Sequence, residues 1–280
     1  MPSTSPLVSL PHLAAVEVAG PDAAQFLNGQ LSNDTLSLAP GAWQLTSWST
    51  PKGRVVVVLS LGRIDDRYYA VLPRELATPF IERLSKYILR AKVSLRLVST
   101  ELAVWGSIAA PDRFAIQPAM APASALDVLD TERRWKLARI AAGLPQIYPS
   151  TAEQFVAQMI NLDLVQGVSF HKGCYTGQEI IARTQNLGRI KRRMLRFAIG
   201  PLASGPFPSS DPGSVRVGDV VTLGDFGPSH IVELAAADAG EELLAVVHLE
   251  PRMDAAKAET APRIEAHERP LPYSIPERTP

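Results

Sequence analysis

The sequence predicts an α+β protein with more than one lobe, built from antiparallel sheets and helices and ending in a small β-barrel or sandwich. Three patterns support this: N-terminal apolar runs joined by tight turns, an amphipathic helix pattern after them, and a group of short strand patterns near the C-terminus. A chain of 280 residues is long enough for about two or three domains.

The N-terminal patterns predict an antiparallel meander rather than a strand–helix–strand unit. Thr50–Gly53 carries the Pro and Gly of a hairpin loop between two apolar, β-branched runs. After the meander, apolar residues recur at spacings of three and four, which favours one face of a helix. The expected elements are, in order, a strand over Leu13–Val18, a short helix over residues 23–31 closed by Gly29, strands over Trp43–Ser49, Arg54–Leu61 and Arg67–Leu72, a helix over Pro73–Arg90, and strands over Lys92–Val98 and Leu102–Ile108.

The middle of the chain has weaker patterns. Ala109–Leu129 is rich in Ala and Pro and predicts a variable loop or a shortened lobe. Trp135–Gly143 suits a strand or a short helix, and Thr151–Ile160 suits a helix. The Gly, Pro and Ser content of Gly200–Gly213 is typical of a linker or wide loop. Beyond it we expect strands over Ser214–Gly224, His230–Ala237 and Glu242–Glu250, and an irregular Pro-rich tail over Glu268–Pro280.

Composition excludes several classes of protein. Apolar residues make up 46% of the chain, and 28 Lys and Arg balance 28 Asp and Glu, which excludes a disordered chain and a whole-surface polyanion binder. The N-terminus lacks the pattern of a secretory signal, and no apolar run is long enough to span a membrane, so we expect a cytoplasmic protein without membrane contact. One cysteine and scattered histidines predict no internal disulfide and no stably bound metal.

The single cysteine lies in the segment Phe170–Glu179, between two glycines. Thr176 and Glu179 fit a capping box, which would place Cys174 just before a helix and close to its positive end. Together with Lys172, this position favours the thiolate form. The alternative is that Cys174 is a small buried packing residue. Pairing with His171 is disfavoured, because adjacent side chains of an extended segment point to opposite faces.

A run of basic residues without an intervening acid follows this segment. Such a run predicts a local anion-binding patch for phosphates, a polyglutamate tail or RNA, and a solvated basic face is the equally supported alternative. The residues are Arg183, Arg189, Lys191, Arg192, Arg193 and Arg196.

The eight residues Lys172, Gly173, Cys174, Tyr175, Thr176, Gly177, Gln178 and Glu179 resemble the signature of the YgfZ family. Members of that family are folate-binding proteins, linked to tRNA modification, that act in iron–sulfur cluster assembly or repair. The resemblance extends over most of the chain. It includes Gly20–Asp22, Gly29–Asp34, Pro51–Arg54, Lys86–Val93, Ala142–Pro145 and Pro270–Ser274.

The family is related to the glycine-cleavage T-protein, a tetrahydrofolate-dependent aminomethyltransferase. The resemblance therefore implies a T-protein-like, multi-lobed folate-binding fold with ferredoxin-like antiparallel α+β elements. It implies a folate-binding body over 1–199, made of two interleaved lobes of which the second covers residues 93–135. A C-terminal β-barrel with the Pro-rich tail would occupy 200–280.

The resemblance also implies ligand contacts. Trp135 matches a folate-contacting tryptophan, Leu13 falls where some relatives have a second one, and Gln158 corresponds to the glutamate that anchors the pterin in the aminomethyltransferases. An indole at Trp135 would stack on the folate ring, or else pack in the core. The strand over Arg54–Leu59 lacks the catalytic aspartate of those transferases, which argues against aminomethyl transfer.

We therefore expect a protein that binds tetrahydrofolate or another folate and supports [4Fe–4S] enzymes such as tRNA methylthiotransferases. Its expected partners are iron–sulfur client enzymes or assembly factors, with Cys174 as a redox or cluster-contact thiolate and Lys172 beside it. Two alternatives stay open. One is a tetrahydrofolate-dependent one-carbon transferase or demethylase, and the other is a tRNA-binding protein acting through the basic run.

Overall fold

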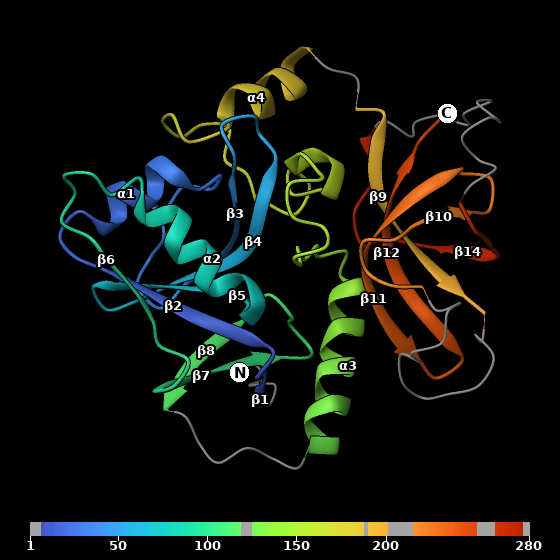
Figure 1. Cartoon of the computed structure of the whole chain (residues 1–280), viewed down its shortest axis with the longest axis horizontal. Helices are drawn as coiled ribbons and strands as arrows, with labels where there is room; N and C mark the ends of the chain where they lie inside the picture. The colour runs from blue at the N-terminus through green and yellow to red at the C-terminus, as the bar shows by residue number, and fades with distance from the viewer. Residues whose placement is uncertain (1–6, 119–124, 188–189, 201–214, 251–260, 277–280) are drawn as a thin grey trace.

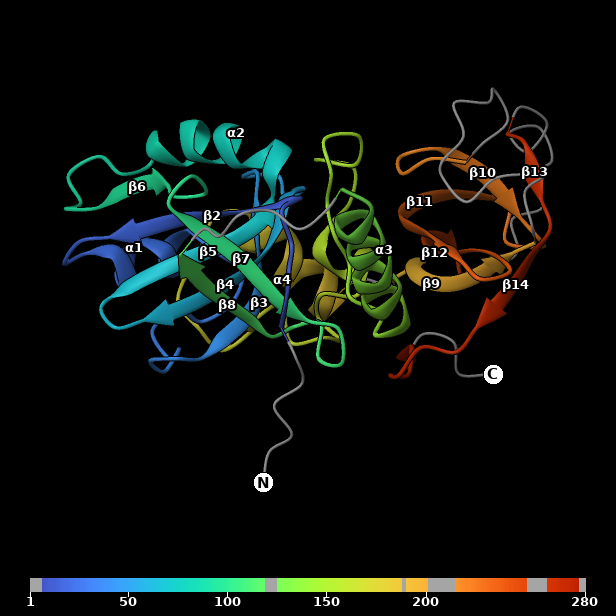
Figure 2. The same ribbon diagram turned by 90° about the horizontal axis from the view of Figure 1, so that it is seen from below.

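The computed structural model describes residues 7–118, 125–187, 190–200, 215–250 and 261–276 (Figure 1). The described chain forms an N-terminal body with two sheets and a C-terminal body with one. Helix α3 (Ala125–Ala141) lies between the two bodies in both views (Figures 1 and 2). Most of the expected linker, residues 201–213, and Arg189 of the basic run lie outside the described residues.

The five-stranded sheet confirms the expected meander. All its neighbouring strands are antiparallel, and the β3–β4 hairpin turns at Thr50–Gly53 as predicted, with the Gly53 amide donating to the Thr50 carbonyl oxygen. The strands, in spatial order, are β3 (Trp43–Ser49), β4 (Val55–Ile64), β5 (Arg67–Pro73), β2 (Leu13–Ala19) and β6 (Ser94–Leu97).

Both faces of this sheet are buried. Helices α1 (Ala23–Gln30) and α2 (Arg74–Ser85) pack their apolar residues against one face, in the largest core cluster of the protein. The other face, through Leu13 and Ala15, contacts a three-stranded sheet of β1 (Leu7–Ser9), β7 (Leu102–Ser107) and β8 (Phe114–Pro118). Figure 2 shows β7 and β8 crossing in front of the larger sheet.

Three local predictions are wrong. Gly29 lies inside α1 rather than closing it, and α2 ends at Ser85 rather than Arg90. The stretch read as a variable loop contains β8, because Phe114 and Ile116 pack against the core while the strand pairs with β7. The same stretch contains the start of α3, so Trp135 lies within a helix of 17 residues.

The segment Thr151–Ile160 is helical only in its last turn, the 3₁₀ helix η1 (Ala157–Ile160). Its first half instead bonds to the start of β4: the Val55 amide donates to the Phe155 carbonyl oxygen, and the Glu153 amide to that of Val55. Periodicity does not reveal such a long-range backbone pairing.

The C-terminal body is a nearly closed six-stranded barrel. Strands β13 (Arg263–Ile264) and β14 (Ala266–Arg269) stand at opposite edges of the sheet, yet only Glu265 separates them, so one short segment links the two edges. The other strands are β9 (Arg192–Ile199), β10 (Val220–Leu223), β11 (Pro228–Ala237) and β12 (Gly240–His248).

Strand β9 changes the expected boundary between the bodies. Residues 192–199, which we assigned to the first body, pair with β12 and β14 and so form part of the barrel. The irregular tail was expected from Glu268, but Glu268 and Arg269 belong to β14 and pair with β9. From residue 270 to 276 the tail has no strand, as expected, and it is anchored: the Tyr273 hydroxyl donates to the Gly143 carbonyl oxygen at 2.8 Å.

A buried ion pair joins the barrel to the first body. Arg193 on β9 is 1% exposed, and its guanidinium donates to both carboxylate oxygens of Asp163, at 2.7 and 3.0 Å. The same guanidinium donates to the carbonyl oxygen of Gln158 on η1 at 2.7 Å. These contacts fix β9 against the η1 segment.

We predict that Asp163→Asn lowers the free energy of unfolding by about 3 kcal/mol, because it replaces the carboxylate that binds a buried guanidinium through two hydrogen bonds with a neutral amide. Urea unfolding measures the effect. Glu153→Gln is the control, since Glu153 forms an exposed ion pair with Arg83 at 2.7 Å, and it should cost less than about 1 kcal/mol. Equal losses in the two variants would contradict the structural role of the buried pair.

Candidate functional site

Cys174 lies in the loop between residue 170 and the start of α4 (Gln178–Leu187), which covers the β3–β4 turn at the top of Figure 1. Its side chain is exposed. The alternative that Cys174 is a buried packing residue is therefore wrong. The thiol is open to a partner molecule.

Lys172 anchors this loop. Its ammonium donates to the carbonyl oxygens of Asn28, Leu31 and Asn33, at 2.6, 2.7 and 2.9 Å. Burial lowers the pKa of Lys172 to about 8, and the carboxylate of Asp34 partly offsets that effect. Each ammonium hydrogen has a backbone acceptor at the end of α1, so Lys172 holds the loop to α1 and makes no hydrogen bond to Cys174.

Two glycines let the loop pack closely on the β3–β4 turn. Gly177 has a φ of +84°, and a Cβ there would lie 2.6 Å from the Thr50 carbonyl oxygen. A Cβ on Gly53, which has a φ of +69°, would lie 2.8 Å from the Cβ of Ile180. Gly173, by contrast, has open space around it. Of the two glycines that bracket Cys174, only Gly177 is required by packing.

The predicted capping box is wrong. Helix α4 begins at Gln178, directly after the left-handed Gly177, so Thr176 stands outside the capping position. The Thr176 hydroxyl donates instead to Oε1 of Gln30 at 3.1 Å, and Oε1 of Gln178 accepts from the Tyr175 amide. Cys174 thus stands further from the helix than expected, and a helix dipole acts mainly within the first turn.

The three residues matched to folate contacts are all buried. Trp135 is 1% exposed; its ring centroid lies 5.2 Å from that of His12 and 6.1 Å from that of Phe114. Leu13 belongs to the same core cluster. Gln158 lies apart from them, with its amide donating to the Ile181 carbonyl oxygen on α4 and its own Oε1 buried without a partner among the described residues. The structure therefore brings together Trp135 and Leu13, but not Gln158.

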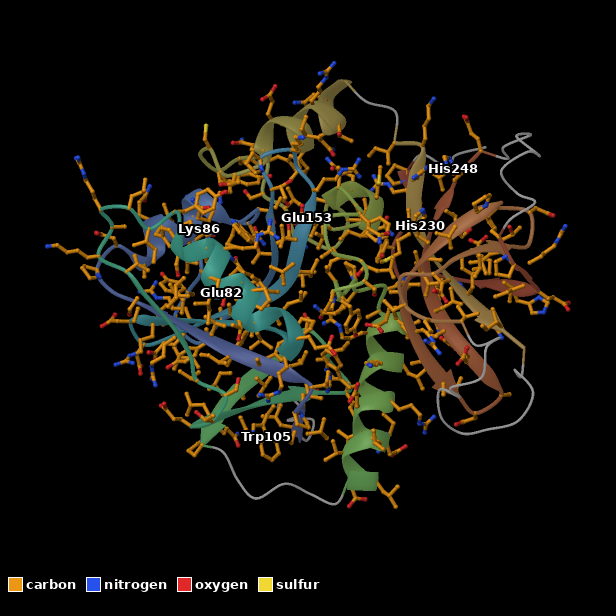
Figure 3. All side chains as sticks on the ribbon, in the orientation of Figure 1. Glu82, Lys86, Trp105, Glu153, His230 and His248 are labelled. Carbon is orange, nitrogen blue, oxygen red and sulfur yellow. The ribbon has the colours of Figure 1, made fainter. Side chains whose placement is uncertain are left out.

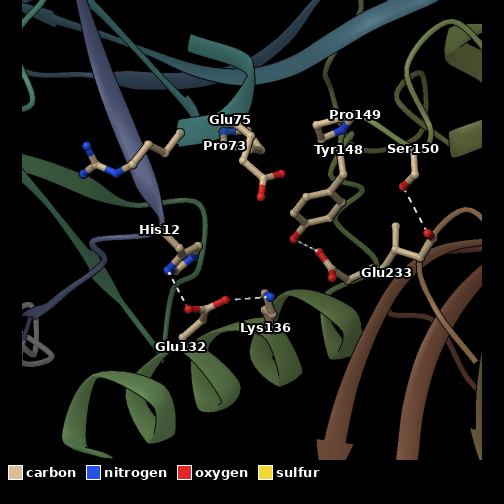
Figure 4. A pocket seen from close by; sticks show the side chains of 11 residues that line it. His12, Pro73, Glu75, Glu132, Lys136, Tyr148, Pro149, Ser150 and Glu233 are labelled. Atoms are coloured by element: carbon tan, nitrogen blue, oxygen red, sulfur yellow. Dashed lines mark hydrogen bonds and ion pairs between the residues drawn. The ribbon is translucent and has the colours of Figure 1, made fainter. Parts of the chain in front are cut away.

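A cleft of about 540 Å³ opens beside Trp135 and Leu13, between the start of α2, helix α3 and strand β11 (Figure 4). A volume of this size is typical of small-molecule sites. Its polar lining comes from both bodies: His12, Arg74, Glu75, Glu132, Lys136, Tyr148, Ser150 and Glu233. Sequence reasoning missed this cleft; the i,i+4 pair Glu132–Lys136 next to Trp135 was its one visible signal.

Glu233, which is buried, and Tyr148, which is half-buried, form a pair in the wall of the cleft (Figure 4). The Tyr148 hydroxyl donates to Glu233 at 2.7 Å. Burial raises the pKa of Glu233, and burial together with the Glu233 carboxylate raises the pKa of Tyr148 well above its ordinary value. Burial alone would lower the pKa of Lys136, but the carboxylates of Glu233 and Glu132 outweigh it and raise that pKa.

His12 gives the cleft unused hydrogen-bonding capacity. Burial lowers its pKa to about 4, even though Glu132 stands 3.6 Å away, so the ring is neutral near pH 7. Both ring nitrogens are buried without a hydrogen-bond partner among the residues that the structure describes. A neutral imidazole offers one donor and one acceptor. The cleft thus combines carboxylate acceptors with an unsatisfied ring, which suits a neutral heterocycle that carries N–H groups.

The predicted anion patch is largely absent from the surface. Arg193 is buried against Asp163, Arg192 donates to Nε2 of His248 at 2.8 Å, and Arg196 pairs with Glu242. Asp163 and Glu242, which come from distant segments, thus neutralise Arg193 and Arg196. Within the described chain, Arg183 and Lys191 stay exposed.

No metal-binding group of three or more His, Cys, Asp or Glu side chains occurs in the described part of the chain. Within the same residues, no helix has both the length and the apolar content to cross a membrane.

We predict that His12 makes the protein less stable in acid. Its pKa is about 4 in the folded protein, against 6.5 for an ordinary histidine. As the pH falls from 6.5 to 4 the unfolded chain takes up the proton first, so stability falls, by on the order of 3 kcal/mol in all. Urea unfolding across this range should show a smaller loss for His12→Gln than for the wild type. The same loss in both would contradict the assignment.

Comparison with known proteins supports a family assignment, although no family model matches the sequence. The tRNA-modifying protein YgfZ of Edwardsiella ictaluri is 30% identical over an alignment that covers 96% of this chain and 92% of that protein. The tRNA-modifying protein YgfZ of Klebsiella pneumoniae is 27% identical over 229 residues, covering 67% and 70% of the two chains.

Among solved structures, the glycine cleavage system aminomethyltransferase T of Bartonella henselae covers 87% of this chain, and 78% of its own chain is matched, with a TM-score of 0.58. At 14% identity this likeness shows the fold alone. It confirms the predicted α+β, T-protein-like architecture. With 30% identity over nearly its whole length, and with the Lys172–Glu179 signature, the chain belongs to the YgfZ family of tRNA-modifying proteins.

Proposed function

We propose that this protein is a folate-binding accessory protein of iron–sulfur metabolism that supports [4Fe–4S] enzymes such as tRNA methylthiotransferases. The observation that carries the proposal is the Lys172–Glu179 loop, which presents an exposed Cys174 from a fixed backbone. Lys172 and Gly177 hold the loop and leave the thiol free to meet a partner. The names of the relatives support the link to tRNA modification.

The chemistry proposed for Cys174 is limited by what one thiol can do. It can exchange with a disulfide, or it can supply one ligand to an iron–sulfur cluster. A cluster needs further ligands, which a partner protein, glutathione or a second copy of the chain would supply. Lys172 acts in this proposal as an anchor of the loop, because its three donors are already used by backbone carbonyls.

We place the folate in the cleft between the two bodies. His12 lines the cleft and packs against Trp135, so the cleft is adjacent to the cluster that holds Trp135 and Leu13. The amino-pyrimidine edge of a pterin carries N–H donors, which carboxylates such as Glu75 and Glu132 accept. Trp135 and Leu13 would then not touch the pterin; they would pack behind His12 and hold it in place. Gln158 lies elsewhere in the first body and is not part of this site.

An accessory role is favoured over one-carbon transfer. In the described structure the first eight residues of β4, Val55 onward, are buried, and none of the residues in the strand carries a carboxylate. A carboxylate is what would orient or deprotonate an amine there. Formation of methylenetetrahydrofolate from tetrahydrofolate and an amine donor by the purified protein would overturn this choice.

We predict that the wild type binds tetrahydrofolate and that Glu75→Gln binds it at least about tenfold more weakly, because the variant loses a charge-assisted hydrogen bond. Calorimetric titration measures the change. The control is Glu82→Gln, an exposed glutamate on the same helix that does not line the cleft (Figure 3). No heat with the wild type would reject folate binding. Equal affinities would instead reject the cleft as its site.

We predict that Cys174→Ala abolishes rescue of tRNA methylthiolation in a deletion strain. The thiol is exposed, so the variant should keep its stability within about 0.5 kcal/mol and its affinity for tetrahydrofolate. Mass spectrometry of the modified nucleoside reports rescue, and thermal unfolding reports the fold. Full rescue by the alanine variant would end the proposed role of the thiol.

A further inference from the structure

The loop between α2 and β6, residues 86–92 and called here the basic loop, exposes an apolar side chain in a strained conformation. Leu89 is 89% exposed and has a φ of +48°. A left-handed backbone costs a non-glycine residue about 1–2 kcal/mol. Because the Leu89 side chain is exposed, it buries almost no apolar surface that would offset this cost. Strained backbone conformations of non-glycine residues cluster at functional sites.

The basic loop is anchored at several points. Ile88 and Val93 pack against the main core cluster, and the Lys92 amide donates to Oδ2 of Asp22 at 2.7 Å. The Ala91 amide closes the turn on the Ile88 carbonyl oxygen at 2.8 Å. The turn therefore holds Leu89 outward at a defined place.

Three cations surround this apolar residue. Lys86, Arg90 and Lys92 are exposed, and none of them makes a side-chain hydrogen bond or ion pair with the described residues. Tyr87 is also exposed, and one edge of its ring contacts Trp48, with centroids 5.9 Å apart. The loop thus has an apolar centre, Tyr87 and Leu89, with a positive rim.

The basic loop is connected to the Cys174 loop through two residues. Trp48, which contacts Tyr87, donates from its indole to Oε1 of Gln30 at 3.4 Å. The same oxygen accepts from the Thr176 hydroxyl at 3.1 Å. A partner seated on the basic loop would therefore lie beside the loop that carries Cys174.

We propose that the basic loop is a docking surface for a protein partner that offers an apolar pocket for Leu89 and an acidic rim for the three cations. Protein interfaces commonly have an apolar centre and a charged rim. A nucleic-acid backbone would satisfy the cations but has no pocket for a leucine side chain. The docking surface does not depend on the proposed function. The further step, in which docking brings the partner to Cys174, rests on the proposed function.

Site-specific photo-crosslinking tests the docking surface. The photo-crosslinking residue p-benzoylphenylalanine replaces Leu89 in the full chain, expressed in the deletion strain, and mass spectrometry identifies the adduct and the crosslinked peptide. We expect a protein adduct on an apolar peptide flanked by acids. Charge reversal at Arg90→Glu and Lys92→Glu should reduce it at least tenfold. The matched control is the same residue at Leu126 on α3, which is 71% exposed and should not capture this partner.

The outcomes separate docking from the proposed function. An RNA adduct, no adduct, or the same adduct at Leu126 would overturn the docking surface. An adduct that depends on the cations, together with full rescue by Cys174→Ala, would support docking and reject the role of the thiol. Loss of rescue by Cys174→Ala without an adduct at position 89 would overturn docking alone. Thermal unfolding of each variant confirms that it is folded.

Discussion

The buried ion pair between Arg193 and Asp163 is the constraint on which the arrangement of the two bodies depends. Arg193 is the second residue of the first barrel strand, and Asp163 follows the η1 turn of the N-terminal body. Asn161 reinforces the junction, since its amide donates to the Met194 carbonyl oxygen at 2.7 Å. Two hydrogen bonds between one guanidinium and one carboxylate fix both the distance and the relative orientation of the groups, and separating them would break a buried ion pair.

The cleft follows from that junction. His12 and Glu132 belong to the first body, whereas Glu233 belongs to β11 of the barrel, and they share a site only because the two bodies are fixed. Burial then sets their protonation: it keeps His12 neutral and raises the pKa of Glu233. The Cys174 loop is a different kind of site. Lys172 ties the loop to backbone carbonyl oxygens of residues 28–33, and the thiol of Cys174 is exposed. One site suits a small ligand, and the other suits a macromolecular partner.

Much of the fold was predictable, because it depends on local patterns. The meander and the barrel strands β10, β11 and β12 show apolar, β-branched runs between Gly and Pro turns, and such runs need little knowledge of their neighbours. Predictions failed where distant residues decide the outcome. Residues 153–155 bond to Val55 instead of forming a helix, and β8 becomes a strand only by pairing with β7. Thr176 binds Gln30 of α1 instead of capping α4.

The sequence by itself determined the family and the presence of a distinctive cysteine loop, since eight contiguous residues of uncommon types need no structure to be recognised. Only the tertiary structure decided how those residues act. It exposed Cys174, directed Lys172 to three carbonyls in and just after α1, buried Trp135, and removed Arg193 from the expected basic patch by pairing it with Asp163. The physical reason is common to all four: burial and charge pairing depend on which segments meet in space, and spacing along the chain does not record that.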